Sequence, residues 1–186
     1  MYAIVSVDSN WGIGYQGNLL QKIPEDMAFF KATTTGHTVI MGRETMTSLP
    51  RQAPLPDRVN IVLSRKMPET LSEMSCAGTE AATRASVSAS AGFYVCPSLD
   101  RLFHELARYE DRFGETRKFV IGGESVYRQL LPFCHTAYVT KFARAYTADR
   151  HFPNLDQDPA WCLGEESEAR AYQGLEFRFT TYRRQA

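Results

Sequence analysis

The alternation of short apolar runs with helix-start patterns constrains the fold of this chain more than any other feature of its sequence. Five runs, rich in β-branched and aromatic residues, have the composition of buried strands: 2–7, 37–41, 59–63, 93–96 and 118–121. Helical patterns begin near Pro24, after Ser98 and after the glycines at 122–123, and we expect Ser98 to cap its helix. Strands that alternate with helices predict an α/β fold with a mostly parallel sheet.

The last third of the chain adds strands of a different kind. Residues 136–142 alternate in character and predict a strand, and apolar runs follow at 161–163 and 175–182. We predict that the last two pair as an antiparallel hairpin that closes the sheet. The 186 residues are then one domain, 1–186, and the small-residue segment 75–92 is a surface insertion.

Charge balance and cysteine spacing exclude several classes of protein. Lysine plus arginine equals aspartate plus glutamate at 21 each, so neither nucleic acid nor an anionic membrane surface is an expected partner. The four cysteines make no metal-ligand spacing with the histidines, and no metal site is expected. With no targeting signal and no apolar run of about 18 residues, we expect a cytoplasmic protein with free thiols and no membrane partner.

An acidic residue on an apolar helix face is the most unusual chemical feature. Pro24 suits the first position of a helix, and Asp26 then lies in the first turn. Helical spacing places Asp26 within a stripe formed by Ile23, Met27 and Phe30. Two interpretations remain open. The carboxylate either stabilises the helix start only, or it is a buried acid that faces ligand donors and whose pKa is raised by desolvation.

Glycines mark three further candidate sites. The loop 8–20 is rich in glycine and apolar side chains, and it either closes over a ligand or is an ordinary mobile loop. Strand ends followed by Gly42-Arg43 and by Gly122-Gly123 suit phosphate groups at helix amino termini, although a helix cap or a tight turn has the same pattern. Ser64 and Arg65 end another strand. They either bind a phosphate ester or form an ordinary solvent-exposed strand end.

Six stretches in order along the chain resemble the dihydrofolate reductase family. They are AIVSV followed by NWGIG; GNLL before IPEDMAFFK; TVIMGRETMTSLP; PLPDRVNIVLSR; FVIGGESVYRQLLP; and AYVT with HFP downstream. They span nearly the whole chain and leave 75–92 least covered. The resemblance implies an eight-stranded, mostly parallel mixed sheet with an antiparallel carboxyl-terminal hairpin, flanked by about four helices. It also implies NADPH-dependent reduction of 7,8-dihydrofolate to tetrahydrofolate, a step of one-carbon metabolism.

The same resemblance implies roles for individual residues. Asp26 is the acid that binds the donors of the pterin ring, and Thr140 carries a hydroxyl bonded to that carboxylate. Arg58 would bind the α-carboxylate of the substrate glutamate bidentately. The remaining substrate-binding positions are Ile4, Val5, Leu19, Met27, Phe30, Leu49, Leu55, Ile121 and Tyr127.

Cofactor-binding positions are implied in the same way. Ser6, Ile13 and Gly14 would border the nicotinamide. Ser64 and Arg65 match positions beside the ribose 2′-phosphate, consistent with NADPH rather than NADH. The other cofactor-binding positions are Gly42, Arg43, Thr45, Leu63, Gly122, Gly123, Glu124, Ser125 and Val126. In this family the Gly122–Gly123 peptide bond is cis.

The implied chemistry is hydride transfer from nicotinamide C4 to pterin C6, with N5 protonated by a water that the loop 8–20 admits. A monomer is expected, with diaminopyrimidine antifolates as further ligands. Two positions depart from the family. Gln21 stands where an aromatic residue is usual, and Leu20 replaces a common proline. The position of the ordered water and the affinity for antifolates are therefore open.

Two other functions remain open. One is a reductase of the same fold that acts on a ribosylaminopyrimidine in riboflavin synthesis, against which the acid of IPEDMAFFK and Arg58 argue. The other is a non-catalytic folate- or nucleotide-binding protein in which Gln21 marks lost activity. Oxidation of NADPH that depends on dihydrofolate distinguishes all three.

Overall fold

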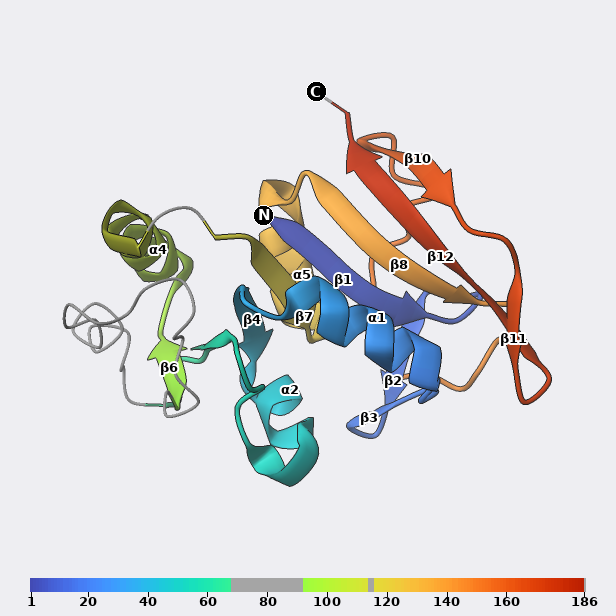
Figure 1. Ribbon diagram of the computed structural model, residues 1–186, viewed down its shortest axis with the longest axis horizontal. Coiled ribbons are helices and arrows are strands. Elements are labelled where there is room, and N and C mark those ends of the chain that lie inside the picture. Colours follow the sequence, from blue (N-terminus) through green and yellow to red (C-terminus); the bar gives the residue numbers. More distant parts are fainter. Residues whose placement is uncertain (68–91, 114–115, 186) are drawn as a thin grey trace. The chain divides into compact units, whose positions relative to one another are not determined.

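The computed structural model describes residues 1–67, 92–113 and 116–185 (Figure 1). The chain divides into two compact units, the first formed by residues 1–33 and 120–186 and the second by residues 34–119. The predicted insertion at 75–92 lies, except for Gly92, outside the described residues. The single domain expected from chain length stays a prediction.

A mixed sheet with strand order β10-β12-β8-β1-β7 organises the first unit. Its strands are β1 (Tyr2–Val7), β7 (Lys118–Gly122), β8 (Thr136–Phe142), β10 (Trp161–Glu166), β11 (Arg170–Tyr172) and β12 (Leu175–Arg184). β1 and β8 are parallel, whereas β12 is antiparallel to β8 and β10. The predicted antiparallel end is confirmed. The predicted simple hairpin is incomplete, because β11 lies between its strands in sequence and pairs with β12.

A second sheet has three strands, two of which lie in the predicted loop 8–20. β2 (Gly12–Tyr15) pairs with β3 (Asn18–Leu19) and with β9 (Arg150–His151). Gln16 and Gly17 connect β2 to β3, and both have positive φ, 49° and 79°. Two-residue connections with this backbone match the twist of a hairpin. The glycines of 8–20 therefore belong largely to an ordered hairpin.

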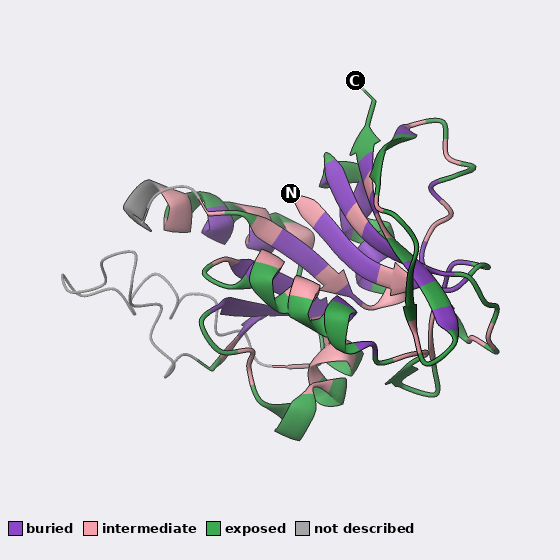
Figure 2. Cartoon of the chain, turned by 45° about the vertical axis from the view of Figure 1, so that its right-hand side comes forward, coloured by how far each residue is buried: buried purple, intermediate pink, exposed green. Residues whose placement is uncertain are grey.

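The helices of the first unit are α1 (Pro24–Thr34), whose last residue belongs to the second unit, α5 (Glu124–Leu130) and the short 3-10 helix η2 (Leu131–Phe133). α1 begins at Pro24, as predicted. Its Phe29 packs against Tyr138 and Phe179 at ring-centroid distances of 6.1 and 4.8 Å. This packing turns Met27 away from the sheet, and Met27 is 39% exposed. The predicted stripe is thus wrong at Met27, and α1 shows a largely exposed outer surface in Figure 2.

Parallel strands, two α-helices and a short 3-10 helix form the described part of the second unit. β4 (Thr38–Gly42), β5 (Val59–Leu63) and β6 (Phe93–Cys96) are adjacent and parallel, and the first two residues of β7 belong to this unit. The helices are α2 (Arg43–Ser48), the short η1 (Pro50–Gln52) and α4 (Leu99–Phe113). The hydroxyl of Ser98 accepts a hydrogen bond from the Arg101 N–H at 3.2 Å, so the predicted cap of α4 is confirmed.

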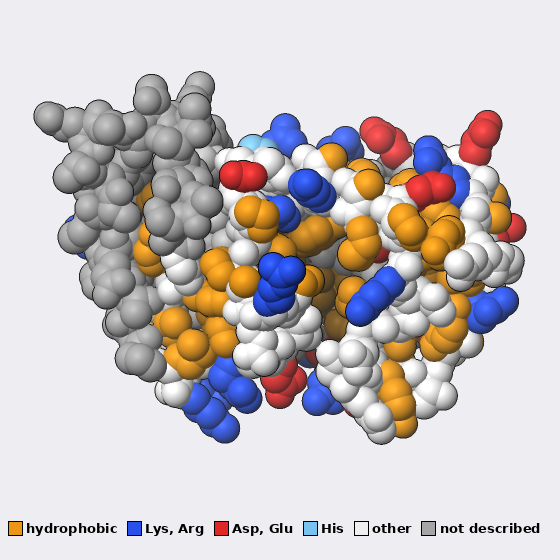
Figure 3. Space-filling view, turned by 60° about the horizontal axis from the view of Figure 1, so that its bottom comes forward, with side chains coloured by type: hydrophobic (Ala, Val, Ile, Leu, Met, Phe, Trp, Pro, Cys, Tyr) orange, Lys and Arg blue, Asp and Glu red, His pale blue; other side chains and the backbone are white. Residues whose placement is uncertain are grey.

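Eight main strands and four α-helices in the described ranges confirm the predicted α/β class with a mostly parallel mixed sheet. None of these helices has both the length and the apolar character needed to cross a membrane. On the face drawn in Figure 3, cationic and anionic side chains are interspersed with hydrophobic ones.

Candidate active site

A buried carboxylate lies at the start of α1. Asp26 is 6% exposed, and the hydroxyl of Thr140 on β8 donates a hydrogen bond to its Oδ1 at 2.7 Å. Ser6 of β1 pairs with Thr140 in the parallel register. Burial raises the pKa of Asp26, and the hydroxyl groups of Thr140 and Ser6 oppose this shift without cancelling it. The structure therefore favours the interpretation of Asp26 as a buried acid over simple helix-start chemistry.

Replacing Thr140 by valine should raise the pKa of Asp26 further. The hydroxyl stabilises the ionised carboxylate, and valine keeps the shape of the side chain but donates no hydrogen bond. The pKa can be followed by carbon-13 NMR titration of the Asp26 carboxyl group. A Thr140→Ser variant retains the donor and should titrate like the unaltered protein. An unchanged pKa in the valine variant would show that the hydroxyl does not control this acid.

The carbonyl group of Ile4 is held from the side of α5. The hydroxyl of Tyr127 donates to the Ile4 oxygen at 2.7 Å, and both residues are buried. Burial raises the pKa of Tyr127, so its hydroxyl remains a neutral donor. Val5 is buried next to Ile4, whereas Ile121 at the end of β7 is partly exposed. Tyr127 thus holds the backbone of Ile4, which is another predicted substrate-binding residue.

The hairpin β2–β3 is attached to the unit through Asp149. The Gln16 N–H donates to Asp149 Oδ2 at 3.0 Å, and the Asp149 N–H donates to the Gly14 oxygen at 3.0 Å. Ile13 and Gly14 are partly buried, whereas Leu19 is 48% exposed. A hollow of about 380 Å³ beside the hairpin is lined by Tyr15, Gln16, Asn18, Leu19, Leu20, Tyr146 and Thr147. The sequence did not single out Asp149, because its partners are more than 130 positions away.

The start of α5 has the backbone of an anion site. The Gly122–Gly123 peptide bond is cis, as expected, and Gly122 has φ of 120°, a conformation that favours glycine. No side chain caps the helix at Gly123. The carboxylate of Glu124 is engaged elsewhere, with Arg128 at 3.0 Å and the His151 N–H at 3.3 Å. Backbone N–H groups at such a helix start suit a phosphate group.

Ser125 and Val126 occupy the next two positions of α5, the first exposed and the second buried. Ser125 has a local role as well. Its hydroxyl and its carbonyl oxygen both accept hydrogen bonds from the Gln129 amide, at 3.0 and 2.9 Å. Together with the glycines, these residues bring all five predicted positions of this segment to one helix start.

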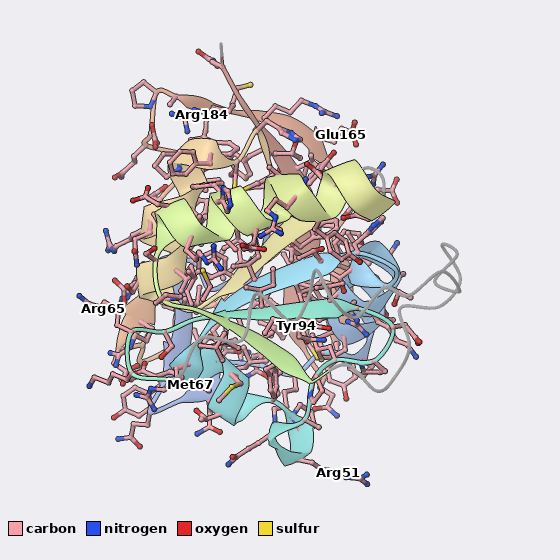
Figure 4. The ribbon with its side chains drawn as sticks, turned by 90° about the vertical axis from the view of Figure 1, so that its left-hand side faces the viewer. Arg51, Arg65, Met67, Tyr94, Glu165 and Arg184 are labelled. Atoms are coloured by element: carbon pink, nitrogen blue, oxygen red, sulfur yellow. The ribbon has the colours of Figure 1, made fainter. Side chains whose placement is uncertain are left out.

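Two strand ends meet in the second unit. Gly42 pairs with Leu63 in the parallel register of β4 and β5, so the residues that follow them lie at one edge of the sheet. Arg43 and Arg65 are both exposed, and Arg65 lies at the periphery of the molecule in Figure 4. Ser64 accepts a hydrogen bond from the Lys66 N–H at 3.2 Å. Thr45, in the first turn of α2, is partly exposed. This edge offers the cations and hydroxyls that a phosphate ester needs.

A buried arginine forms a second candidate site in this unit. Arg58 is 5% exposed, and its guanidinium donates to Thr34 Oγ1 at 3.0 Å and to the Pro56 oxygen at 2.9 Å. Burial lowers the pKa of Arg58, but arginine stays protonated at neutral pH. Such a preoriented cation suits a carboxylate ligand.

Apolar side chains accompany Arg58 in the same unit. Leu49 and Leu55 are partly exposed, and the Asn60 side chain holds the backbone of Leu55 through two hydrogen bonds of 2.9 Å. Asn60 was not recognised from the sequence, because an asparagine inside a strand has no local signature of this contact. In the first unit, Phe30 of α1 is likewise partly exposed.

Comparison with known proteins shows the family to which the chain belongs. The family model for dihydrofolate reductase matches residues 1–184. The dihydrofolate reductase of Bacillus subtilis is 34% identical over 154 residues, which cover 83% of this chain and 76% of the relative. The enzyme of Neisseria meningitidis serogroup A is 32% identical over 182 residues, 97% of this chain and 96% of the relative. The enzyme of Drosophila melanogaster is 31% identical over 162 residues, which cover 82% of this chain and 78% of the relative.

The family model spans nearly the whole chain, and three relatives are 31–34% identical to it. This chain therefore belongs to the dihydrofolate reductase family, whose members are oxidoreductases that reduce dihydrofolate to tetrahydrofolate.

Proposed function

We propose that this protein reduces 7,8-dihydrofolate with NADPH, by hydride transfer from nicotinamide C4 to pterin C6 and protonation of N5 through a water molecule. The observation that carries the proposal is the buried carboxylate of Asp26, bonded to Thr140, in a chain of this family. Asp26 accepts hydrogen bonds from the amino and ring N–H groups of the pterin. Because burial raises its pKa, the carboxylate binds a protonated or donor-rich ring strongly.

Asp26 does not itself reach N5 in this proposal. The hairpin β2–β3 admits a single water to N5 and excludes the bulk solvent, and Asp149 keeps the hairpin attached. Gln21, which is partly exposed, replaces the usual aromatic residue and can hydrogen-bond this water. Leu19, Met27 and Phe30 are more exposed than core residues, as expected of side chains that a bound substrate covers.

The donor set fits NADPH. In the first unit, the uncapped backbone at Gly123 suits a phosphate of the pyrophosphate. In the second unit, the cationic edge of β4 and β5, with the uncapped backbone at Gly42, suits the 2′-phosphate. Ser6, Ile13 and Gly14 would border the nicotinamide, and Leu63 would be a further cofactor-binding residue. When bound, NADPH supplies the hydride, and the protein orients the two rings.

Replacing Arg65 by alanine should narrow the preference for NADPH over NADH by about 10- to 100-fold, the range expected when a charged hydrogen bond is lost. The comparison to measure is kcat/KM for the two cofactors. Arg51→Ala, which removes another exposed arginine of the same unit, is the matched control and should leave the ratio unchanged. If the ratio also stays the same in Arg65→Ala, other residues hold the 2′-phosphate.

The proposal as a whole is tested by the consumption of NADPH with dihydrofolate, with and without a diaminopyrimidine antifolate. We expect turnover that requires both ligands and that the antifolate inhibits. Binding of both ligands without turnover would instead identify a non-catalytic binding protein. A monomer in the cytoplasm is part of the proposal, and light scattering after gel filtration measures the oligomeric state.

A further inference from the structure

A closed cluster of polar groups lies on the face of β8 opposite to Asp26. Thr140 and Lys141 are consecutive on the strand, so their side chains point to opposite faces. Lys141 Nζ donates to Asp156 Oδ2 and to the Tyr182 hydroxyl, each at 2.7 Å. The Tyr182 hydroxyl in turn donates to Asp156 Oδ1, so that each of the three groups bonds to the other two.

The cluster encloses the indole ring of Trp11. Lys141 Nζ lies 4.9 Å from the centroid of this ring, within the range of a cation–π contact. The Tyr182 ring approaches edge-on at 6.0 Å, and the Phe152 ring stacks on the indole at 6.2 Å. Trp11 is 5% exposed and has φ of 63°, a backbone conformation that is costly for a bulky residue. The surrounding contacts must therefore hold it in place.

Trp11 is the residue directly before β2, and two connections lead from it to the candidate active site. Along the chain, Ile13 and Gly14 follow in the hairpin. Through space, the Trp11 oxygen accepts the Phe152 N–H at 2.8 Å, and the Phe152 ring packs edge-on against Tyr127 at 4.7 Å. The hydroxyl of Tyr127 holds the Ile4 carbonyl. A displacement of Trp11 would thus reach both the hairpin and the backbone of β1.

We propose that Lys141, Asp156 and Tyr182 are positioning residues for the reduction: they hold Trp11, and Trp11 fixes the position of the hairpin β2–β3. None of the three is assigned a contact with substrate or cofactor. The inference rests on the proposed function, because it takes the hairpin to be the segment that closes over the bound ligands. Loosening the cluster should therefore slow turnover while leaving ligand affinity nearly unchanged.

The two tryptophans of the chain provide a direct probe. In a Trp161→Phe background, Trp11 is the single tryptophan, and its fluorescence reports its surroundings. Adding Lys141→Met removes the charge and keeps most of the side-chain length. We expect Trp11 emission to shift to longer wavelength and kcat to fall about tenfold, with KM for dihydrofolate changed less than about twofold. Lys141→Arg keeps a cation able to stack on indole, so its Trp11 emission and its kcat should both lie close to those of the background protein.

Arg178→Met is the matched control. Arg178 lies opposite Lys141 in the register with β12 and forms an ion pair of 2.8 Å with Glu166, so its removal deletes a neighbouring charge of the same face. It should leave Trp11 emission and kcat unchanged. Tyr182→Phe removes only one hydroxyl of the cluster and should reproduce the Lys141→Met pattern more weakly, which covers the case in which that variant folds poorly.

Three results would overturn the inference: unchanged Trp11 emission in Lys141→Met, an emission shift with unchanged kcat, or an equal loss of kcat in Arg178→Met. Turnover of dihydrofolate by the unaltered chain is measured first. Its absence would contradict the proposed function, and the emission of Trp11 in the variants would still decide whether Lys141 holds that ring.

Discussion

Asp26→Asn is expected to lower the turnover of dihydrofolate at neutral pH by about 100-fold or more, the range typical of removing a positioned acid or base. Asparagine has nearly the same shape and still accepts the hydrogen bond from Thr140, but it carries no charge and presents an N–H₂ donor to the donors of the pterin. Turnover should recover in part at acidic pH, where the substrate is protonated without help. Steady-state rates across the pH range measure both effects.

The same substitution should stabilise the folded protein at neutral pH. The pKa of Asp26 is raised in the folded state, whereas an unfolded aspartate has a pKa of about 3.9. The folded state therefore binds the proton more tightly, and the stability falls as the pH rises from the unfolded pKa through the folded pKa. Above that range the buried charge costs free energy, which asparagine avoids. A higher denaturation midpoint at neutral pH, with lower turnover, would show that activity is not lost through unfolding.

Two results would contradict this account of Asp26. Unchanged turnover at neutral pH would remove the carboxylate from the mechanism. A denaturation midpoint that falls at neutral pH but not at low pH would show that the ionised carboxylate is favourably bound in the folded protein, contrary to the direction of its pKa shift.

Arg58→Met is expected to raise KM for dihydrofolate by about 100-fold, with a smaller effect on kcat. Loss of one partner of a buried charge pair typically costs about 2–5 kcal/mol in binding, which corresponds to roughly 30- to several-thousand-fold. The guanidinium is held by Thr34 and Pro56, so it meets the substrate carboxylate already oriented. Initial rates over a range of dihydrofolate concentrations provide the test.

A substrate analogue gives the matched control for Arg58. A dihydropterin without the glutamate has no α-carboxylate, and its kcat/KM should be the same in the unaltered protein and in Arg58→Met. Arg58→Lys keeps the charge but not the planar pair of donors. Its KM for dihydrofolate should therefore lie between those of the unaltered protein and of Arg58→Met. If kcat/KM in Arg58→Met falls as much for the analogue as for dihydrofolate, Arg58 stabilises the fold and does not bind the substrate carboxylate.

The parts of the fold that were predicted correctly depend on local patterns. The run at 2–7 is rich in β-branched and apolar residues, a composition that suits a largely buried strand. Pro24 and the acidic first turn locate the start of α1 to the residue, because both act within the first helical turn. The cap at Ser98 is equally local.

The features that the sequence did not predict depend on contacts between distant segments. Met27 lies on the apolar stripe by spacing alone, but the packing of Phe29 against β8 and β12 decides which face of α1 is covered. The attachment of the hairpin by Asp149 joins positions more than 130 residues apart. The cluster around Lys141 likewise depends on the pairing of β8 with β12. Such contacts have no signature in a single sequence.

The resemblance to a family supplied what neither periodicity nor spacing contained. An acid in a helical first turn and a glycine pair after a strand each have a common structural explanation, and only their combination in one order pointed to folate chemistry. The structure adds that Asp26 is buried and bonded to Thr140, and that Gly122 requires a backbone conformation typical of glycine.

A crystal structure with folate and oxidised cofactor tests the central claim most directly. The account predicts that the Asp26 carboxylate, still bonded to Thr140, lies within about 2.7–3.2 Å of the ring N–H and amino groups of the pteridine. An Asp26 side chain turned toward solvent, with the pteridine ring bound elsewhere, would contradict it.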